Sequence, residues 1–183
     1  DITWYGVLSG SAISFLTVYA TRLGGDAFQI GLLTAGPAVV NLLATLPSGR
    51  WLETRPIGPA VFWSAAFHRL FYLLWIIIPW LLLPTKEIWA YILVTLLMSI
   101  PGTVLAVGFN ALFADAVPPE WRPHVTGVRN AVLSVAFIVT SLGCGVILES
   151  MPFPQGYQVV FAIGALGAIM STVHLYFVRP LSD

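Results

Sequence analysis

The chain has 183 residues, of which 58% are hydrophobic and only 9% are charged, and its formal net charge is zero. A soluble domain usually carries about 25% charged residues. A chain this apolar cannot cover its own surface in water, so we expect lipid to surround much of it. The balanced charge excludes the strongly basic surface of a nucleic-acid-binding protein, and we expect no nucleic-acid partner.

Apolar runs long enough to cross a membrane recur along the whole chain. A bilayer core about 30 Å thick requires roughly 20 consecutive apolar residues in a helix. Runs of that size, separated by Gly, Pro and charged turns, predict transmembrane helices over residues 3–23, 28–46, 59–83, 88–113, 125–148 and 157–178. Pro47 is expected to end the second helix and Pro84 the third, and Pro101 to interrupt the fourth. No ten-residue alternating pattern of a membrane β-barrel recurs. The sequence therefore predicts an all-α, polytopic membrane protein in which residues 1–183 form a single six-helix domain.

Positive residues are unevenly distributed between the two sides of these helices. With the N-terminus in the cytoplasm, the inner segments hold five arginines: Arg50, Arg55, Arg122, Arg129 and Arg179. The outer loops hold only Arg22 and Lys86. Cytoplasmic loops carry an excess of Lys and Arg, so we expect a multi-pass protein of the plasma (inner) membrane with both termini in the cytoplasm.

The loop between the second and third predicted helices carries a spaced set of Gly, acidic and basic residues. Gly49 is followed four residues later by Glu53 and then by Arg55. This loop resembles the signature loop of the major facilitator superfamily, although Pro56 and Ile57 stand where that loop has a later Gly and a basic pair. Residues 115–130 similarly resemble the loop between the fourth and fifth helices of many members. The resemblance implies one half of a transporter fold, built as two inverted three-helix repeats.

Six residues of these loops are candidates for a cytoplasmic latch: Gly49, Glu53, Arg55, Asp115, Arg122 and Arg129. Gly49 would allow two helices to approach closely. Glu53 could pair with Arg55 or Arg129, and Asp115 could join through Arg122. Such ion pairs would favour an outward-open state and would have to break on opening inward. The alternative is a short hydrophilic turn that only keeps charge out of lipid.

Small and polar residues recur at helical spacing on four of the predicted helices, which places them on one face of each helix. Seven are candidates for a substrate cavity: Ser14, Thr17, Asn41, Ser99, Thr103, Asn110 and Ser134. The same pattern is compatible with tight helix packing alone. Asn41 and Asn110 favour the cavity, because an amide side chain in hydrocarbon needs a partner or water. The resemblance implies that the first and fourth helices line this cavity and that the second and fifth contribute.

Arg69, preceded by His68, is the most unusual residue of the predicted helices. Ten residues of helical rise after Pro59 place it ~15 Å deep, close to the midplane. A charge there costs at least ~2.5 kcal/mol without a partner. No Asp or Glu is expected at the same depth in any predicted helix. The expected partners are the ring of Tyr72, backbone carbonyls freed at Pro101, or an anion, so Arg69 is either a structural clamp or a contact to an anionic solute.

No nucleotide-loop, metalloprotease or serine-hydrolase motif is present, and we expect neither enzymatic activity nor a metal or cofactor. The preferred function is transport of a small solute by alternating access, as a half-transporter that pairs with a second half or with a second copy of the chain. The first alternative is a non-transporting accessory or scaffold subunit among neighbouring membrane subunits. The second is the substrate-binding component of an ATP-driven vitamin importer, which the signature-like loop disfavours.

Overall fold

The fold is helical throughout the part of the chain that the computed structural model describes, residues 1–177. Its elements in chain order are α1 (Ile2–Leu8), the π-helical segment η1 (Ser9–Ile13), α2 (Ser14–Arg22), α3 (Ala27–Glu53), α4 (Ile57–Leu81), α5 (Pro84–Ala116), the short 3₁₀ helix η2 (Pro119–Trp121), α6 (Arg122–Ser150) and α7 (Gln155–Leu175). Five helices, α3 to α7, are long and apolar enough to cross a membrane. The expectation of an all-α membrane protein is confirmed.

The first helical segment is continuous in spite of its three labels. α1, η1 and α2 follow one another without a gap, and the backbone at both junctions stays in the right-handed helical region. A π turn inserts one extra residue per turn. In keeping with this wide turn, the Ser14 hydroxyl donates to the carbonyl oxygen of Ser9 at 2.6 Å. Residues 2–22 therefore form one helical path with a local widening.

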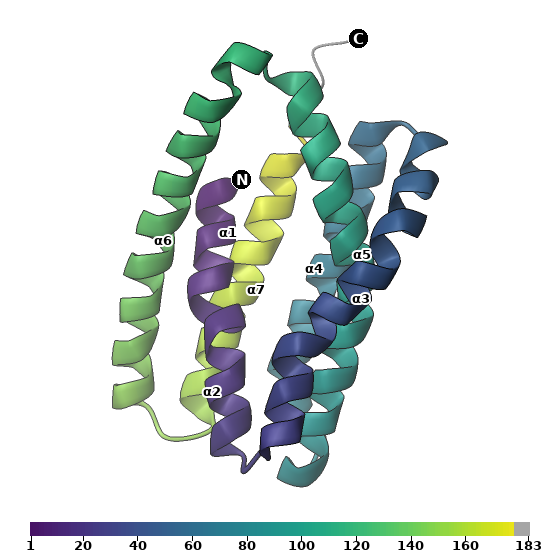
Figure 1. The fold of residues 1–183 in the computed structure, drawn as a ribbon. Coiled ribbons are helices and arrows are strands. Elements are labelled where there is room, and N and C mark those ends of the chain that lie inside the picture. Colours follow the sequence, from purple (N-terminus) through teal and green to yellow (C-terminus); the bar gives the residue numbers. More distant parts are fainter. Residues whose placement is uncertain (178–183) are drawn as a thin grey trace.

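The helices pack in two groups, which lie side by side in Figure 1. In the first group, the α1–η1–α2 segment packs on both α6 and α7. In the second, α5 packs on both α3 and α4, and α4 contacts α7 across the boundary between the groups. The α3–α4 and α5–α6 connections, Asp1 and the last turn of α7 lie toward one end of the bundle, here named the Arg55 end; the other three connections lie at the opposite Lys86 end (Figure 1).

Several helix ends differ from the sequence prediction because proline acts differently at different positions. α3 continues through Pro47 to Glu53, so the expectation that Pro47 ends this helix is wrong. A proline removes one backbone hydrogen bond but does not force a helix to end where neighbouring helices support it. For the same reason α5 passes through Pro101 without interruption. Pro84 is a different case: it occupies the first turn of α5, where a missing N–H costs nothing, and so it begins α5 rather than ending α4. Val178, the predicted last residue of the sixth helix, and Arg179 lie outside the described residues.

A dense aromatic cluster joins the two groups at the Lys86 end. The Tyr19 ring contacts the rings of Tyr91, Tyr157 and Phe161 at centroid distances of 5.7, 5.0 and 5.5 Å. The Tyr19 hydroxyl donates to a carboxylate oxygen of Glu87 at 2.8 Å. All of these side chains are buried. Because lipid provides no hydrophobic drive between helices, ring packing and this hydrogen bond hold α2, α5 and α7 together here.

Glycines allow the first helical segment to approach its neighbours closely. A Cβ added at Gly10 would lie 2.6 Å from the carbonyl oxygen of Phe137 in α6, and one added at Gly167 of α7 would lie 2.9 Å from the carbonyl oxygen of Trp4. Gly10 therefore serves helix packing. Gly49, which was expected to permit a close approach, has no neighbour within 4 Å of an added Cβ.

Gly10 and Gly49 give a matched pair of substitutions. We expect Gly10→Ala to lower the free energy of unfolding by about 1–3 kcal/mol, because the added methyl group meets backbone atoms that cannot rotate away. Gly49→Ala should be neutral or slightly stabilising, because alanine favours the helix and meets nothing there. Thermal unfolding of the two variants in detergent, followed by tryptophan fluorescence, measures the difference. Equal stability of the two variants would show that η1 and α6 are not in close contact.

Candidate functional site

A cavity of about 710 Å³ lies between the two groups of helices. This volume is typical of small-molecule sites. Its polar lining comes mainly from α2, α3 and α5, its aromatic lining includes Tyr5, Tyr72, Trp75 and Phe109, and its charged lining residues are Asp1, Arg69 and Arg129. Trp75 contacts Tyr91 and Phe161 of the aromatic cluster. Trp75 therefore forms the floor of the cavity, and the cluster packs behind it toward the Lys86 end.

Four of the seven predicted cavity residues line this cavity: Thr17, Asn41, Ser99 and Asn110. Thr103 lies behind the lining and is buried, and its hydroxyl donates to the Asn41 amide oxygen at 2.7 Å. That bond orients one of the two amides on which the cavity hypothesis depends. The prediction of this face of α3 and α5 from residue spacing therefore agrees with where the structure places the residues.

Ser14 and Ser134 lie outside the cavity lining. The Ser14 hydroxyl is directed back along its own helix to Ser9. Ser134 is exposed on α6, because α6 turns the neighbouring residues Leu133, Ala136 and Phe137 toward α1. Among the described residues of α6, only Arg129 reaches the cavity.

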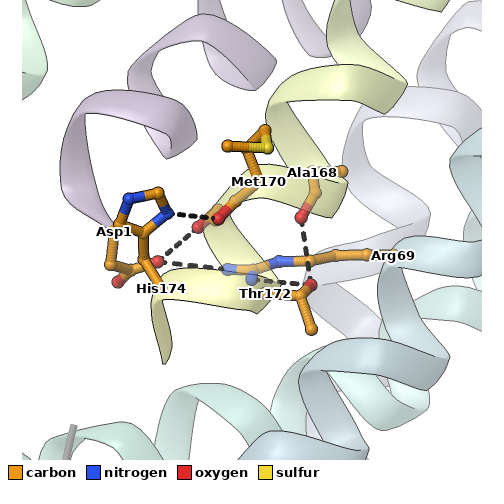
Figure 2. Close-up of polar contacts among 7 residues, drawn as sticks. Asp1, Arg69, Ala168, Met170, Thr172 and His174 are labelled. Carbon is orange, nitrogen blue, oxygen red and sulfur yellow. Dashed lines mark hydrogen bonds and ion pairs between the residues drawn. The ribbon is translucent and has the colours of Figure 1, made fainter. Parts of the chain in front are cut away.

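Arg69 joins three helices at the side of the cavity (Figure 2). Its Nη1 donates to the hydroxyl of Thr172 in α7 at 3.0 Å, and its Nη2 lies 3.7 Å from the Asp1 carboxylate. The Ser171 hydroxyl donates to the same carboxylate. The guanidinium is thus held by an acid that directly precedes α1 and by a hydroxyl of α7.

Asp1, the acid that Arg69 reaches, precedes the first helix and was not among the expected partners. An arginine side chain in a helix extends toward the N-terminus of that helix, so its guanidinium lies at a different depth from its backbone. Arg69 belongs to α4, whose N-terminus is at the Arg55 end, and so its guanidinium reaches the level of Asp1. Its hydrogen-bond partners are not the expected carbonyls near Pro101.

His68, and not Arg69, contacts a backbone carbonyl of α5 in this region. Its Nδ1 lies 2.7 Å from the carbonyl oxygen of Met98 in α5. A carbonyl oxygen can only accept, so Nδ1 carries the proton in this arrangement. The ring stands edge-on to Tyr72 and packs against Gly102, where an added Cβ would lie 2.9 Å from Nδ1. His68 therefore ties α4 to α5 beside the cavity.

Two polar groups of the cavity wall have no hydrogen-bond partner in the described part of the chain. These are the Trp75 indole nitrogen and the Thr95 hydroxyl, both covered by neighbouring atoms. The Trp75 side chain is 3% exposed. A buried donor without an acceptor costs about 1–3 kcal/mol. Because neighbouring atoms cover it, this donor is a cost of the fold beside the cavity and not a group that a solute in the cavity contacts.

The comparison with protein families shows to which family the protein with this cavity belongs. A family model described as Major Facilitator Superfamily matches residues 4–183. The chain belongs to the major facilitator superfamily. It is a multi-pass membrane protein, and members of this superfamily are transporters and not enzymes. No curated protein and no solved structure matches the chain.

The signature loop of this superfamily member does not form the predicted ion pairs in this structure. Arg122 donates to the carbonyl oxygens of Ala114 at 2.6 Å and Val117 at 3.0 Å, and so satisfies the C-terminal end of α5. Arg55 lies over the Trp51 ring at 4.4 Å. Within residues 1–177 the one ion pair is that of Arg69 with Asp1, so Glu53 and Asp115 are unpaired there.

Arg129, the remaining cation of the predicted latch, also lacks an acidic partner among residues 1–177. Its guanidinium lies over the rings of Phe109 at 4.7 Å and Phe113 at 5.3 Å. The rings and carbonyl groups that these arginines contact belong to their own or the adjoining helix. The acids Glu53 and Asp115 are instead exposed. Of the predicted pairs, only that of Glu53 with Arg129 joins the two loops, and neither it nor the pairs within each loop are formed among residues 1–177.

Sequence reasoning missed three features of this member of the superfamily. Asp1 was placed outside the membrane helices, and the Tyr19–Glu87 hydrogen bond was not considered, because each joins residues far apart in the chain. Trp75 and Tyr72 were not predicted to line the cavity, because the cavity prediction rested on the helical spacing of small and polar residues. The usable signal was Glu87 itself, an acid in the first turn of an otherwise apolar helix.

Proposed function

We propose that this chain carries a small solute across the membrane by alternating access, as a half-transporter that pairs with a second half, either a separate chain or a second copy. The observation that carries the proposal is the cavity between the two groups of helices, which polar residues line and an aromatic cluster closes at the Lys86 end. Membership of a transporter family supports it. Nothing in the proposal requires catalysis, a metal or a cofactor.

The arrangement of neighbours supports six crossings in two inverted repeats. If the first segment (α1–α2) is exchanged with the fourth (α5), the second (α3) with the fifth (α6), and the third (α4) with the sixth (α7), the main packing contacts map onto one another. The exchanged segments run in opposite directions in Figure 1. Both properties are those of inverted-topology repeats, and they require the α1–α2 segment to be a sixth crossing.

The proposed orientation places the Arg55 end in the cytoplasm of a cell whose plasma (inner) membrane holds the protein. Arg50, Arg55 and Arg122 lie at that end and Arg22 and Lys86 at the other, which is the distribution that the positive-inside rule describes. Both the start of α1 and the end of α7 would then be cytoplasmic. In this orientation the cavity of the present structure is closed on the outer side.

Cysteine accessibility in proteoliposomes tests alternating access. Cys144 is the single cysteine of the chain, so it is first replaced by alanine. In this background Thr17→Cys, near the cavity floor, should react with a membrane-impermeant thiol reagent added from the Arg55 side. It should also react, more slowly, with the reagent added from the Lys86 side. Leu42→Cys is the control, because Leu42 is 76% exposed on α3 outside the cavity lining and a thiol in lipid stays unreactive. Reaction of Thr17→Cys from one side only would contradict alternating access and would favour a non-transporting subunit.

A further inference from the structure

The cavity of the proposed transporter carries more positive than negative charge. Among residues 1–177, two guanidinium groups, Arg69 and Arg129, line it together with a single carboxylate, that of Asp1. Arg69 is satisfied by that carboxylate and by Thr172. Arg129 is therefore the cation of the lining that the described residues leave without a counter-charge.

The environment of Arg129 leaves its hydrogen-bonding capacity free. The residue is seven positions into α6, which places it roughly 10 Å from the start of that helix. The two phenylalanine rings stabilise its charge by cation–π contacts, worth about 0.5–2 kcal/mol, but they accept no conventional hydrogen bond. A guanidinium has five N–H donors, and no acceptor for those of Arg129 is found within residues 1–177. A carboxylate could accept two of these donors at once.

The cavity floor provides no comparable contact for a solute. The indole nitrogen of Trp75 has no acceptor in the described part of the chain, but neighbouring atoms cover it. Arg129 is a charged donor that lines the cavity. An electron-rich group would satisfy its N–H donors, whereas a cationic ligand would be repelled by it.

We propose, as an extension of the proposed transport function, that the solute is an organic monoanion whose carboxylate binds Arg129 and whose apolar body lies along Phe109, Met98 and Tyr72. One negative charge balances the cavity. The apolar side chains between Arg129 and Trp75 match an aromatic or aliphatic body. Arg129 is the residue that selects the charge, and the volume of the cavity admits a solute of drug size.

Binding to the purified full chain in detergent tests this inference, with benzoate, salicylate and octanoate as probes and benzamide and benzylamine as neutral and cationic comparisons. Calorimetry should detect at least one carboxylate and neither comparison compound. Arg129→Gln should weaken that binding by about tenfold or more, equivalent to about 1.4 kcal/mol. Arg129→Lys should retain part of it.

Arg55→Gln is the matched control, because Arg55 also lies over an aromatic ring but is exposed and does not line the cavity. It should leave binding unchanged. Failure of all three carboxylates to bind, or equal binding by the Arg129→Gln variant, overturns the inference. The Thr17→Cys experiment is separate: alternating access without carboxylate binding would refute only the substrate class, and carboxylate binding without alternating access would refute only transport.

Discussion

Asp1→Asn is expected to lower the free energy of unfolding by about 2–3 kcal/mol, because it leaves the Arg69 guanidinium buried without a counter-charge. Removing one partner of a fully buried ion pair typically costs about 3–5 kcal/mol. The expected loss is smaller here, since the Asp1 side chain is 20% exposed and the two charged atoms are 3.7 Å apart. Thermal or denaturant unfolding in detergent measures the change.

A double-variant cycle separates the ion pair from other effects of the substitution. Arg69→Met in the Asp1→Asn background should recover most of the lost stability, because an apolar side chain of similar length needs no partner. Glu120→Gln is the control, since Glu120 is an exposed acid toward the same end of the bundle and forms no ion pair among residues 1–177. If Asp1→Asn behaves like Glu120→Gln, Arg69 is held by Thr172 alone and Asp1 is irrelevant to the fold.

Tyr19→Phe is expected to lower the free energy of unfolding by about 1–3 kcal/mol through the loss of one hydroxyl group. That hydroxyl is the hydrogen-bond donor to Glu87, whose side chain is 4% exposed. A buried acceptor that loses its donor retains the full cost of leaving water. Because the ring itself is preserved, the contacts with Tyr91, Tyr157 and Phe161 should change little, and thermal unfolding reports the hydrogen bond.

Tyr157→Phe is the matched control within the same cluster. Tyr157 is 2% exposed, and its hydroxyl forms no hydrogen bond in the part of the chain that the structure describes. Its replacement should change stability by less than about 0.5 kcal/mol. Adding Glu87→Leu to Tyr19→Phe should restore part of the loss, because both polar groups are then absent. Equal effects of the two tyrosine substitutions would show that Glu87 does not depend on Tyr19.

Residue spacing grouped polar residues on one face of a helix, and on two helices that face lines the cavity. Asn41, Ser99 and Asn110 follow the helical repeat of α3 and α5, and they line the cavity. Ser14 and Ser134 followed similar patterns but do not line it. A repeat along one helix shows which residues share a face, but it does not show which way that face turns.

The resemblance found in the signature loop is confirmed by the family match, but the contacts predicted for that loop are not formed. Glu53 and Arg129 belong to different helices, and their pairing depends on how far those helix ends approach each other. Arg122 forms a different set of contacts: the carbonyl groups at the C-terminal end of α5, and not an acid, accept its hydrogen bonds.

The amino-acid sequence by itself determined that this is a helical membrane protein, because apolar run length and turn residues act locally and the bilayer demands that each helix satisfy its own backbone. It also indicated the family and one face of two helices. Only the tertiary structure decided that Asp1 reaches Arg69, that Tyr19 reaches Glu87, and that Arg129 faces the cavity with no acidic partner in the described part of the chain. These contacts depend on the relative depth and rotation of helices distant in the chain, and on how far long side chains extend, none of which is encoded in the spacing along a single helix.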